Sequence, residues 1–88
     1  MLKPVYTNKF QKDLKKIRSR IKDMEELKTV MLELGKSRGL DPKYQDHKLG
    51  GKWKGRRECH IEPDWLLIYK IESEFIVFER TGSHSDLF

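Results

Sequence analysis

The chain has 88 residues, of which 36% are hydrophobic and 38% are charged, and its formal net charge is +5. This length allows one domain with one modest core, so we expect a single domain over residues 1–88. The apolar content excludes a disordered chain, and no apolar run reaches the ~18 residues of a membrane-spanning helix. One cysteine cannot form an internal disulfide, and the N-terminus lacks the apolar segment of a signal peptide. We therefore expect a cytoplasmic protein with no membrane partner.

Positive charge is concentrated in two stretches of the sequence. Residues 1–22 carry eight Lys and Arg against one Asp, a net of +7, and residues 47–60 carry five against one Glu, a net of +4. Two separated basic stretches favour a polyanionic partner, an acidic protein partner, or both. For residues 9–22 taken alone, a solvated helix face explains the charge equally well.

The first half of the chain predicts one short strand and two helices. Residues 2–6 are typical of a strand at a sheet edge, because Pro4 lacks a backbone donor. Helix start signals follow at Asn8 and at Asp23, and each precedes an apolar stripe at helical spacing. Gly35 and Gly39 are candidate ends of the second helix. These signals predict two antiparallel helices joined by a tight turn.

The second half predicts a loop followed by three strands. Residues 40–55 contain Pro42, three glycines and no periodicity, which indicates a long loop of the kind that often carries function. Residues 56–61, 65–71 and 75–80 each have a strand pattern, and the nearly continuous apolar run at 65–71 predicts a central strand covered on both faces. The expected fold class is α+β, in the order β-α-α-β-β-β, with an antiparallel sheet that carries the two helices on one face.

The predicted sheet brings distant polar residues to one edge. In a meander, His60 ends one strand, Asp64 stands before the next, and Arg80 ends the third, whose tail carries His84. The long loop can deliver His47 to the same place. Histidine both gives and takes protons near neutral pH, so histidines among fixed positive charges suit acid–base chemistry on a phosphodiester.

The residues at this edge also resemble a known family. The sequence is similar to the YafQ-type toxins of the RelE/ParE superfamily of bacterial toxin–antitoxin systems. The similarity covers essentially the whole chain, and its most specific segments are Gln45-Asp46-His47, Gly51-Lys52-Trp53-Lys54, Arg57-Glu58-Cys59-His60, Glu62-Pro63-Asp64-Trp65, Arg80-Thr81-Gly82-Ser83-His84 and Leu87-Phe88. The resemblance implies a RelE-like fold and a ribosome-dependent mRNA endonuclease that inhibits translation. It also implies a cognate DinJ-like antitoxin as partner, besides the ribosome and mRNA.

The resemblance further implies a reaction without metal or other cofactor, in which the RNA 2′-OH attacks the adjacent phosphorus. His84 occupies the place of a main catalytic histidine and is expected to be the general acid. Either His47 or His60 is expected to be the base, with Asp64 orienting an imidazole and Phe88 stacking on a base. Exchange of the acid and base roles remains open.

The remaining expected site residues bind RNA. Arg80 has the planar fork of donors that suits a phosphate in the transition state. The indole of Trp65 is expected to stack on a base. The residues expected to bind the RNA backbone are cations: Lys52, Lys54, Arg56 and Arg57. Glu58 stands where some relatives carry Asp and has no assigned role, and Trp53 is either a packing lid or a base-stacking group.

Three alternatives compete with the endonuclease hypothesis. Three histidines and an aspartate can bind a metal, but their spacings match no standard zinc pattern and the surrounding cations disfavour a dication. A ParE-like protein that poisons DNA gyrase would share the fold without needing three histidines at one sheet edge. A non-catalytic RNA-binding module would show salt-sensitive binding that is indifferent to the histidines.

Overall fold

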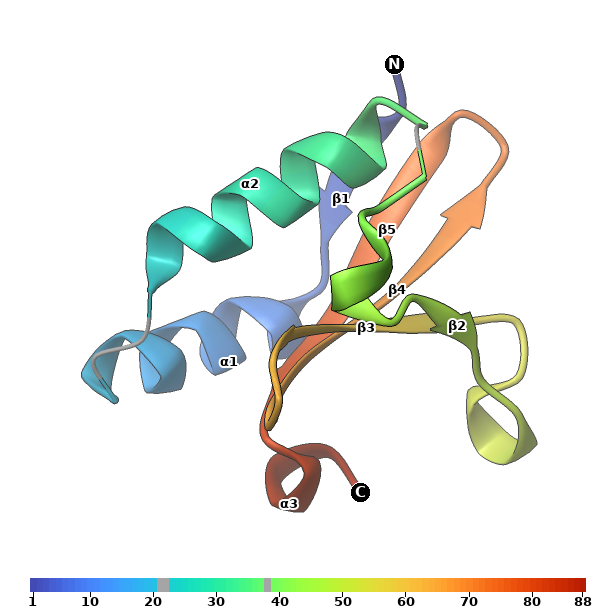
Figure 1. Ribbon diagram of the computed structural model, residues 1–88. Helices are drawn as coiled ribbons and strands as arrows, with labels where there is room; N and C mark the ends of the chain where they lie inside the picture. Colours follow the sequence, from blue (N-terminus) through green and yellow to red (C-terminus); the bar gives the residue numbers. More distant parts are fainter. Residues whose placement is uncertain (21–22, 38) are drawn as a thin grey trace.

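The computed structural model describes residues 1–20, 23–37 and 39–88 (Figure 1). The predicted order of one strand, two helices and three strands is confirmed. The structure also contains short elements that were not predicted: two 3-10 helices and a two-residue strand in the long loop, and a short helix at the C-terminus. The elements are β1 (Lys3–Tyr6), α1 (Asn8–Ser19), α2 (Met24–Gly35), η1 (Pro42–Tyr44), β2 (His47–Lys48), η2 (Gly51–Trp53), β3 (Arg57–Glu62), β4 (Trp65–Glu72), β5 (Phe75–Gly82) and α3 (His84–Leu87).

The strands form one mixed sheet in the order β1-β5-β4-β3-β2. Strands β2 to β5 are antiparallel to their neighbours, as expected, but β1 pairs parallel with β5. Parallel pairing is possible there because α1, α2 and three further strands separate β1 from β5, so no hairpin fixes their relative direction. The α+β class is confirmed, whereas the expected fully antiparallel sheet is corrected to a mixed one.

The strand β4 lies at the centre of the sheet and contributes to a core on each face. Trp65, Leu67 and Tyr69 belong to the main core, which α1 and α2 cover; both long helices lie on the same side of the sheet in Figure 1. Leu66 and Ile68 belong to a smaller core on the other face, together with Leu49, Trp53 and Leu87. Burial on both faces is the physical reason for the continuous apolar run in this strand.

Local signals set the helix ends. The side chain of Thr7 caps α1 by accepting a hydrogen bond from the backbone N–H of Phe10. The helix begins at Asn8, as predicted, but its cap is the residue before it. Asp23 caps α2 as predicted, and α2 ends at Gly35, the first of the two predicted ends. Within the described ranges, no helix has the length and hydropathy needed to cross a membrane.

Candidate active site

Two histidines meet one carboxylate across the β2–β3 pair. His47 lies directly opposite Glu58, and His60 follows Glu58 on the same face of β3 because side chains alternate along a strand. The Glu58 Oε1 atom lies 3.5 Å from His47 Nε2 and 3.2 Å from His60 Nε2. Glu58 is only 5% exposed, so its carboxylate is held between the two imidazoles. The loop therefore delivers His47, as expected, through the two-residue strand β2.

The third histidine is held by Asp64. His84 is the first residue of α3, and the Asp64 Oδ1 atom accepts hydrogen bonds from its backbone N–H at 3.0 Å and from its ring at Nδ1 at 2.7 Å. Bonding of Nδ1 leaves Nε2 as the ring nitrogen available for proton transfer. The expected role of Asp64 as the residue that orients an imidazole is consistent with this geometry.

Four aromatic rings form a continuous row. The ring centroids of His47 and His60 are 6.2 Å apart, those of His60 and His84 are 5.9 Å apart, and those of His84 and Phe88 are 6.5 Å apart. The Phe88 ring is 59% exposed, at the end of the chain. Three imidazoles able to exchange protons therefore form a row that ends at an exposed aromatic residue, an arrangement that suits acid–base chemistry beside a stacked base.

A clamp fixes the short helix α3. Ser83 and Asp86 form a reciprocal capping box, and Arg20 at the end of α1 donates two hydrogen bonds to the Asp86 carboxylate, at 2.6 and 3.1 Å. These bonds hold the pKa of Asp86 well below its usual range. The bond from Arg20 has the largest effect, and the bond from the Ser83 backbone has the next largest. A Cβ at Gly82 would stand 2.9 Å from Asp86 Oδ2, so this clamp requires a glycine there. The clamp sets where His84 and Phe88 lie.

Trp53 packs between Phe88 and the smaller core. Its ring meets Phe88 edge-on at 6.1 Å and packs on the small core around Leu66 and Ile68. Its Nε1 atom is buried, and within the described part of the chain it has no hydrogen-bond partner. This packing favours the interpretation of Trp53 as a packing lid, and its ring contacts the aromatic group expected to stack on a base.

The structure separates the predicted RNA-binding cations into two exposed lysines and two arginines that are bonded to carboxylates. Lys52 and Lys54 are exposed on the segment that carries Trp53, close to the C-terminal helix. Arg56 donates to Glu79 at 2.8 Å. Arg57 alternates with Glu58 and bonds Asp46 on the opposite face, where the Tyr69 hydroxyl also donates to Asp46. The expected RNA contact by Arg57 is therefore not part of the histidine face.

Arg80 lies in the same cross-strand row as Glu58 and His47, because it pairs with Ile68, which pairs with Glu58. Its guanidinium nevertheless donates to the buried Asp13 of α1, at 2.7 and 3.1 Å. Asp13 thus fixes the direction of Arg80, and the phosphate contact expected of Arg80 stays a prediction.

The structure corrects the expectation for Trp65. Its side chain is 0% exposed, and its Nε1 donates to the Thr81 hydroxyl at 2.9 Å, so it cannot stack on a base. Cys59 lies opposite Leu67 and is buried in the same main core as Trp65, as expected from the alternation along β3. Burial raises the pKa of the Cys59 thiol, which keeps the group neutral and excludes it as a nucleophile.

One group of donors in the site has the geometry to hold a metal ion. The ligand atoms of Glu58, His60 and His84 all lie within 4.8 Å of one another. Imidazole nitrogens with one carboxylate oxygen suit Zn²⁺ or Cu²⁺. This group differs from the metal site considered from the sequence, because it contains only two of the three histidines, His60 and His84, and because Glu58 takes the place of Asp64.

Sequence reasoning missed the connecting residues of the site. Glu58 shares its strand face with His60, and that alternation was the available signal for a joint role. Asp86 follows Ser83 at capping-box spacing, which was the available signal for α3. No local sequence pattern predicts Asp13 as the partner of Arg80, because the two residues are 67 positions apart in the chain.

Comparisons with known proteins agree along the whole chain. A family model described as "Bacterial toxin of type II toxin-antitoxin system, YafQ" matches residues 2–88. The chain is 46% identical to the mRNA interferase toxin YafQ of Escherichia coli (strain K12) over 84 residues, which cover 94% of this chain and 91% of that protein. A copper-bound mutant toxin from Helicobacter pylori superposes with a TM-score of 0.96 at 46% identity, over 100% of both chains. A chain of the E. coli DinJ–YafQ complex superposes with a TM-score of 0.92 at 44% identity, over 100% of this chain and 99% of that chain.

Proposed function

Because the chain belongs to the YafQ family of type II toxin–antitoxin toxins, we propose that it is an mRNA interferase, an endoribonuclease that cuts mRNA on the ribosome. The observation that carries this proposal is the continuous row of His47, His60 and His84, each beside a carboxylate. The DinJ–YafQ complex of the E. coli relative supports a DinJ-type antitoxin as the partner of this toxin.

The proposed reaction needs no metal, because imidazoles carry both proton transfers. The RNA 2′-oxygen bonds to the adjacent phosphorus while the bond from phosphorus to the 5′-oxygen breaks, which leaves a 2′,3′-cyclic phosphate and a 5′-OH. His84, oriented by Asp64, gives its proton to the leaving 5′-oxygen. His60 or His47 takes the proton of the 2′-OH, and Glu58 holds both rings in place. The ring centroids of His60 and His84 are 5.9 Å apart, which supports the proposal that these two groups act on the two oxygens of one phosphodiester.

The RNA is proposed to lie along the exposed part of this face. Lys52 and Lys54 contact its backbone, and Phe88 stacks on the base next to the cut. Arg56, which lies beside Lys54, adds positive charge there while it remains bonded to Glu79. Arg80, directed by Asp13, is proposed to face the phosphate. The exposed cations of α1 suit the backbone of ribosomal RNA, which supports the proposed dependence on the ribosome.

Primer extension on an mRNA in a purified translation reaction tests this proposal. The wild type, His84→Ala and the matched neighbour Ser85→Ala are compared, with and without ribosomes and with and without a chelator. We expect new ends within the reading frame only with ribosomes, from the wild type and Ser85→Ala but not from His84→Ala, and unaffected by the chelator. Intact mRNA from folded wild-type protein would refute the endonuclease, and gyrase poisoning would then be tested.

A metal-inhibited state is a second candidate, favoured by the clustered ligand atoms of Glu58, His60 and His84 and by the copper-bound relative. A bound Cu²⁺ or Zn²⁺ would occupy the imidazole lone pairs that proton transfer needs, so added metal should slow cleavage and a chelator should restore it. Calorimetric titration with Cu²⁺ tests this directly. Equal affinity of the wild type and Glu58→Gln would place the ion elsewhere.

A further inference from the structure

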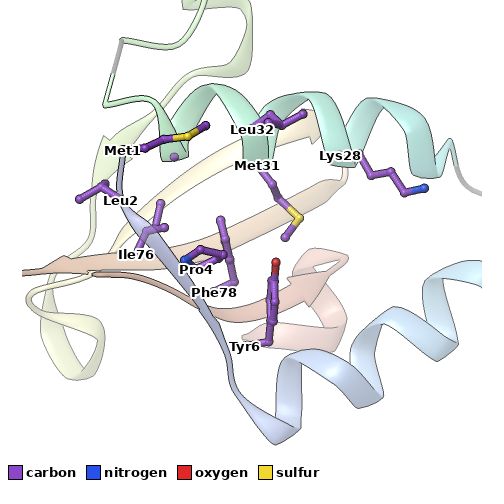
Figure 2. Close-up of a pocket in the computed structure, with 10 residues that line it drawn as sticks. Met1, Leu2, Pro4, Tyr6, Lys28, Met31, Leu32, Ile76 and Phe78 are labelled. Carbon is purple, nitrogen blue, oxygen red and sulfur yellow. The ribbon is translucent and has the colours of Figure 1, made fainter. Parts of the chain in front are cut away.

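The sheet holds its two edge strands in different ways. β1 pairs with β5 over four residues, and Figure 2 shows Met31 of α2 pointing toward Tyr6 of β1. β2 consists of His47 and Lys48, and each of them pairs with one residue of β3. A strand of two residues has too few backbone hydrogen bonds to stay in place by itself. His47 therefore needs a further anchor to keep its place beside Glu58.

The side chain of Asp46, the residue before His47, provides an anchor on the central strands. Its Oδ1 atom accepts a hydrogen bond from the Tyr69 hydroxyl of β4 at 2.7 Å. Arg57 of β3 donates to Oδ1 from Nε and to Oδ2 from Nη2, both at 3.3 Å. Tyr69 is 1% exposed and belongs to the main core, so its hydroxyl is firmly placed. Burial, and then the bond to Asp46, raise the pKa of Tyr69, which keeps the hydroxyl protonated as a donor.

Asp46 acts from the side of the sheet opposite the histidines. Arg57 and Tyr69 are cross-strand neighbours, and their side chains meet Asp46 on the face that α1 and α2 cover. Glu58, the residue after Arg57, points to the other face and lies opposite His47. A change at Asp46 therefore reaches the histidines through the backbone of β2, and it removes no group from the face where the RNA is proposed to lie.

The backbone before Asp46 connects this anchor to the ring of His47. Gln45 has a left-handed backbone with a φ of 51°, which is unfavourable for a residue with a side chain and persists only when its surroundings hold it. Its carbonyl oxygen accepts a hydrogen bond from His47 Nδ1 at 2.7 Å. Because a carbonyl oxygen only accepts, the neutral ring carries its proton on Nδ1. Nε2 is then the nitrogen left to take a proton, 3.5 Å from Glu58 Oε1.

We propose that Asp46 is a positioning residue of the active site: by holding β2 against β3 and β4, it fixes the place and the tautomer of the His47 ring. This inference rests on the proposed function, because it takes the histidine row as the group that acts on the RNA. A misplacement of about 1 Å in a catalytic group can cost about 100-fold in rate. Loss of the anchor should therefore lower kcat and leave KM nearly unchanged, since the RNA-binding surface stays intact.

The kinetic test measures kcat and KM for mRNA cleavage on programmed ribosomes and compares Asp46→Ala with Asp41→Ala. Asp41 is the matched control, because it also accepts a hydrogen bond in this loop, from the backbone of Lys43. We expect Asp46→Ala to lower kcat at least about tenfold with KM within about twofold, and Asp41→Ala to change neither. Asp46→Asn can still accept from Tyr69 and should keep most of the rate. In the His47→Ala background, Asp46→Ala should have almost no further effect.

Nitrogen NMR of the His47 ring measures the positioning without any reaction. The full-length toxin is labelled with ¹⁵N in histidine and studied at a pH where the ring is neutral, and His47→Ala assigns the signals. We expect the wild type and Asp41→Ala to show a protonated Nδ1 and an unprotonated Nε2. Asp46→Ala should show averaged signals of the two tautomers. Tyr69→Phe removes one donor but keeps the buried ring, so it should shift the signals part of the way.

Each other outcome has a defined meaning. An unchanged His47 spectrum or wild-type cleavage by folded Asp46→Ala would overturn the positioning role. An effect of Asp46→Ala that persists in the His47→Ala background would also overturn it, because Asp46 would then act through another group. A wild-type protein that cuts no mRNA would refute the endonuclease, and the His47 spectrum of Asp46→Ala would still decide the positioning. If Asp46→Ala does not fold, a wild-type His47 spectrum of Tyr69→Phe overturns the proposal in its place.

Discussion

The contact between Asp64 and His84 makes the sharpest prediction about the active site. One oxygen of Asp64 holds both the ring and the backbone of His84, at 2.7 and 3.0 Å. A hydrogen bond to a charged group contributes about 1.5 to 3 kcal/mol, and because both side chains are largely exposed, screening by solvent reduces the expected contribution to about 1 to 2 kcal/mol. Asp64→Ala should therefore lower kcat/KM by about 5- to 30-fold, since ~1.4 kcal/mol corresponds to a factor of ten.

A double-mutant cycle distinguishes orientation from direct catalysis. If Asp64 acts through His84, Asp64→Ala should have almost no further effect in the His84→Ala background, as measured by single-turnover cleavage of mRNA on stalled ribosomes. The exposed Glu72→Ala is the control, and urea unfolding checks that Asp64→Ala changes the free energy of unfolding by less than about 1 kcal/mol. Additive effects of the two changes on cleavage would refute our reasoning, because Asp64 would then act on the RNA itself.

Three further predictions follow from contacts elsewhere. Glu58→Gln should lower kcat/KM about tenfold, because loss of its charge weakens the ion-pair contacts to His47 and His60, and a loss of about 1.4 kcal/mol corresponds to a factor of ten; Glu72→Gln should leave it unchanged in the same cleavage assay. The pKa of Asp86 is depressed in the folded protein, so its stabilisation is present above the unfolded pKa of about 3.9 and is lost as the pH falls below it; Asp86→Asn should flatten the acid branch of the stability curve measured by urea unfolding. An unchanged acid branch would show that Arg20 does not stabilise α3 through Asp86. Trp65→Phe should destabilise the fold by about 1 to 3 kcal/mol yet leave the RNA affinity of the folded protein within about twofold, and a selective loss of RNA affinity would contradict its burial.

Much of the fold could be read from local patterns. The helix start at Asp23, the helix end at Gly35 and the burial of both faces of β4 all follow from signals a few residues long, because capping and side-chain alternation depend on near neighbours. The same alternation placed Cys59 in the core and His60 on the other face. The sequence also supplied the three histidines and Asp64 as candidates, because their side-chain chemistry does not depend on the fold.

The tertiary structure decided which of these residues meet. Pairing β1 parallel to β5, seating Glu58 between His47 and His60, and directing Arg80 to Asp13 all depend on contacts between distant parts of the chain, which leave no periodic trace in the sequence. Trp65 illustrates the limit, because an aromatic residue beside a candidate catalytic residue has the same local pattern whether it faces solvent or the core. Which face it takes is set by the register of β4 against β3 and β5 and by the helices packed over them, and that information exists only in the folded molecule.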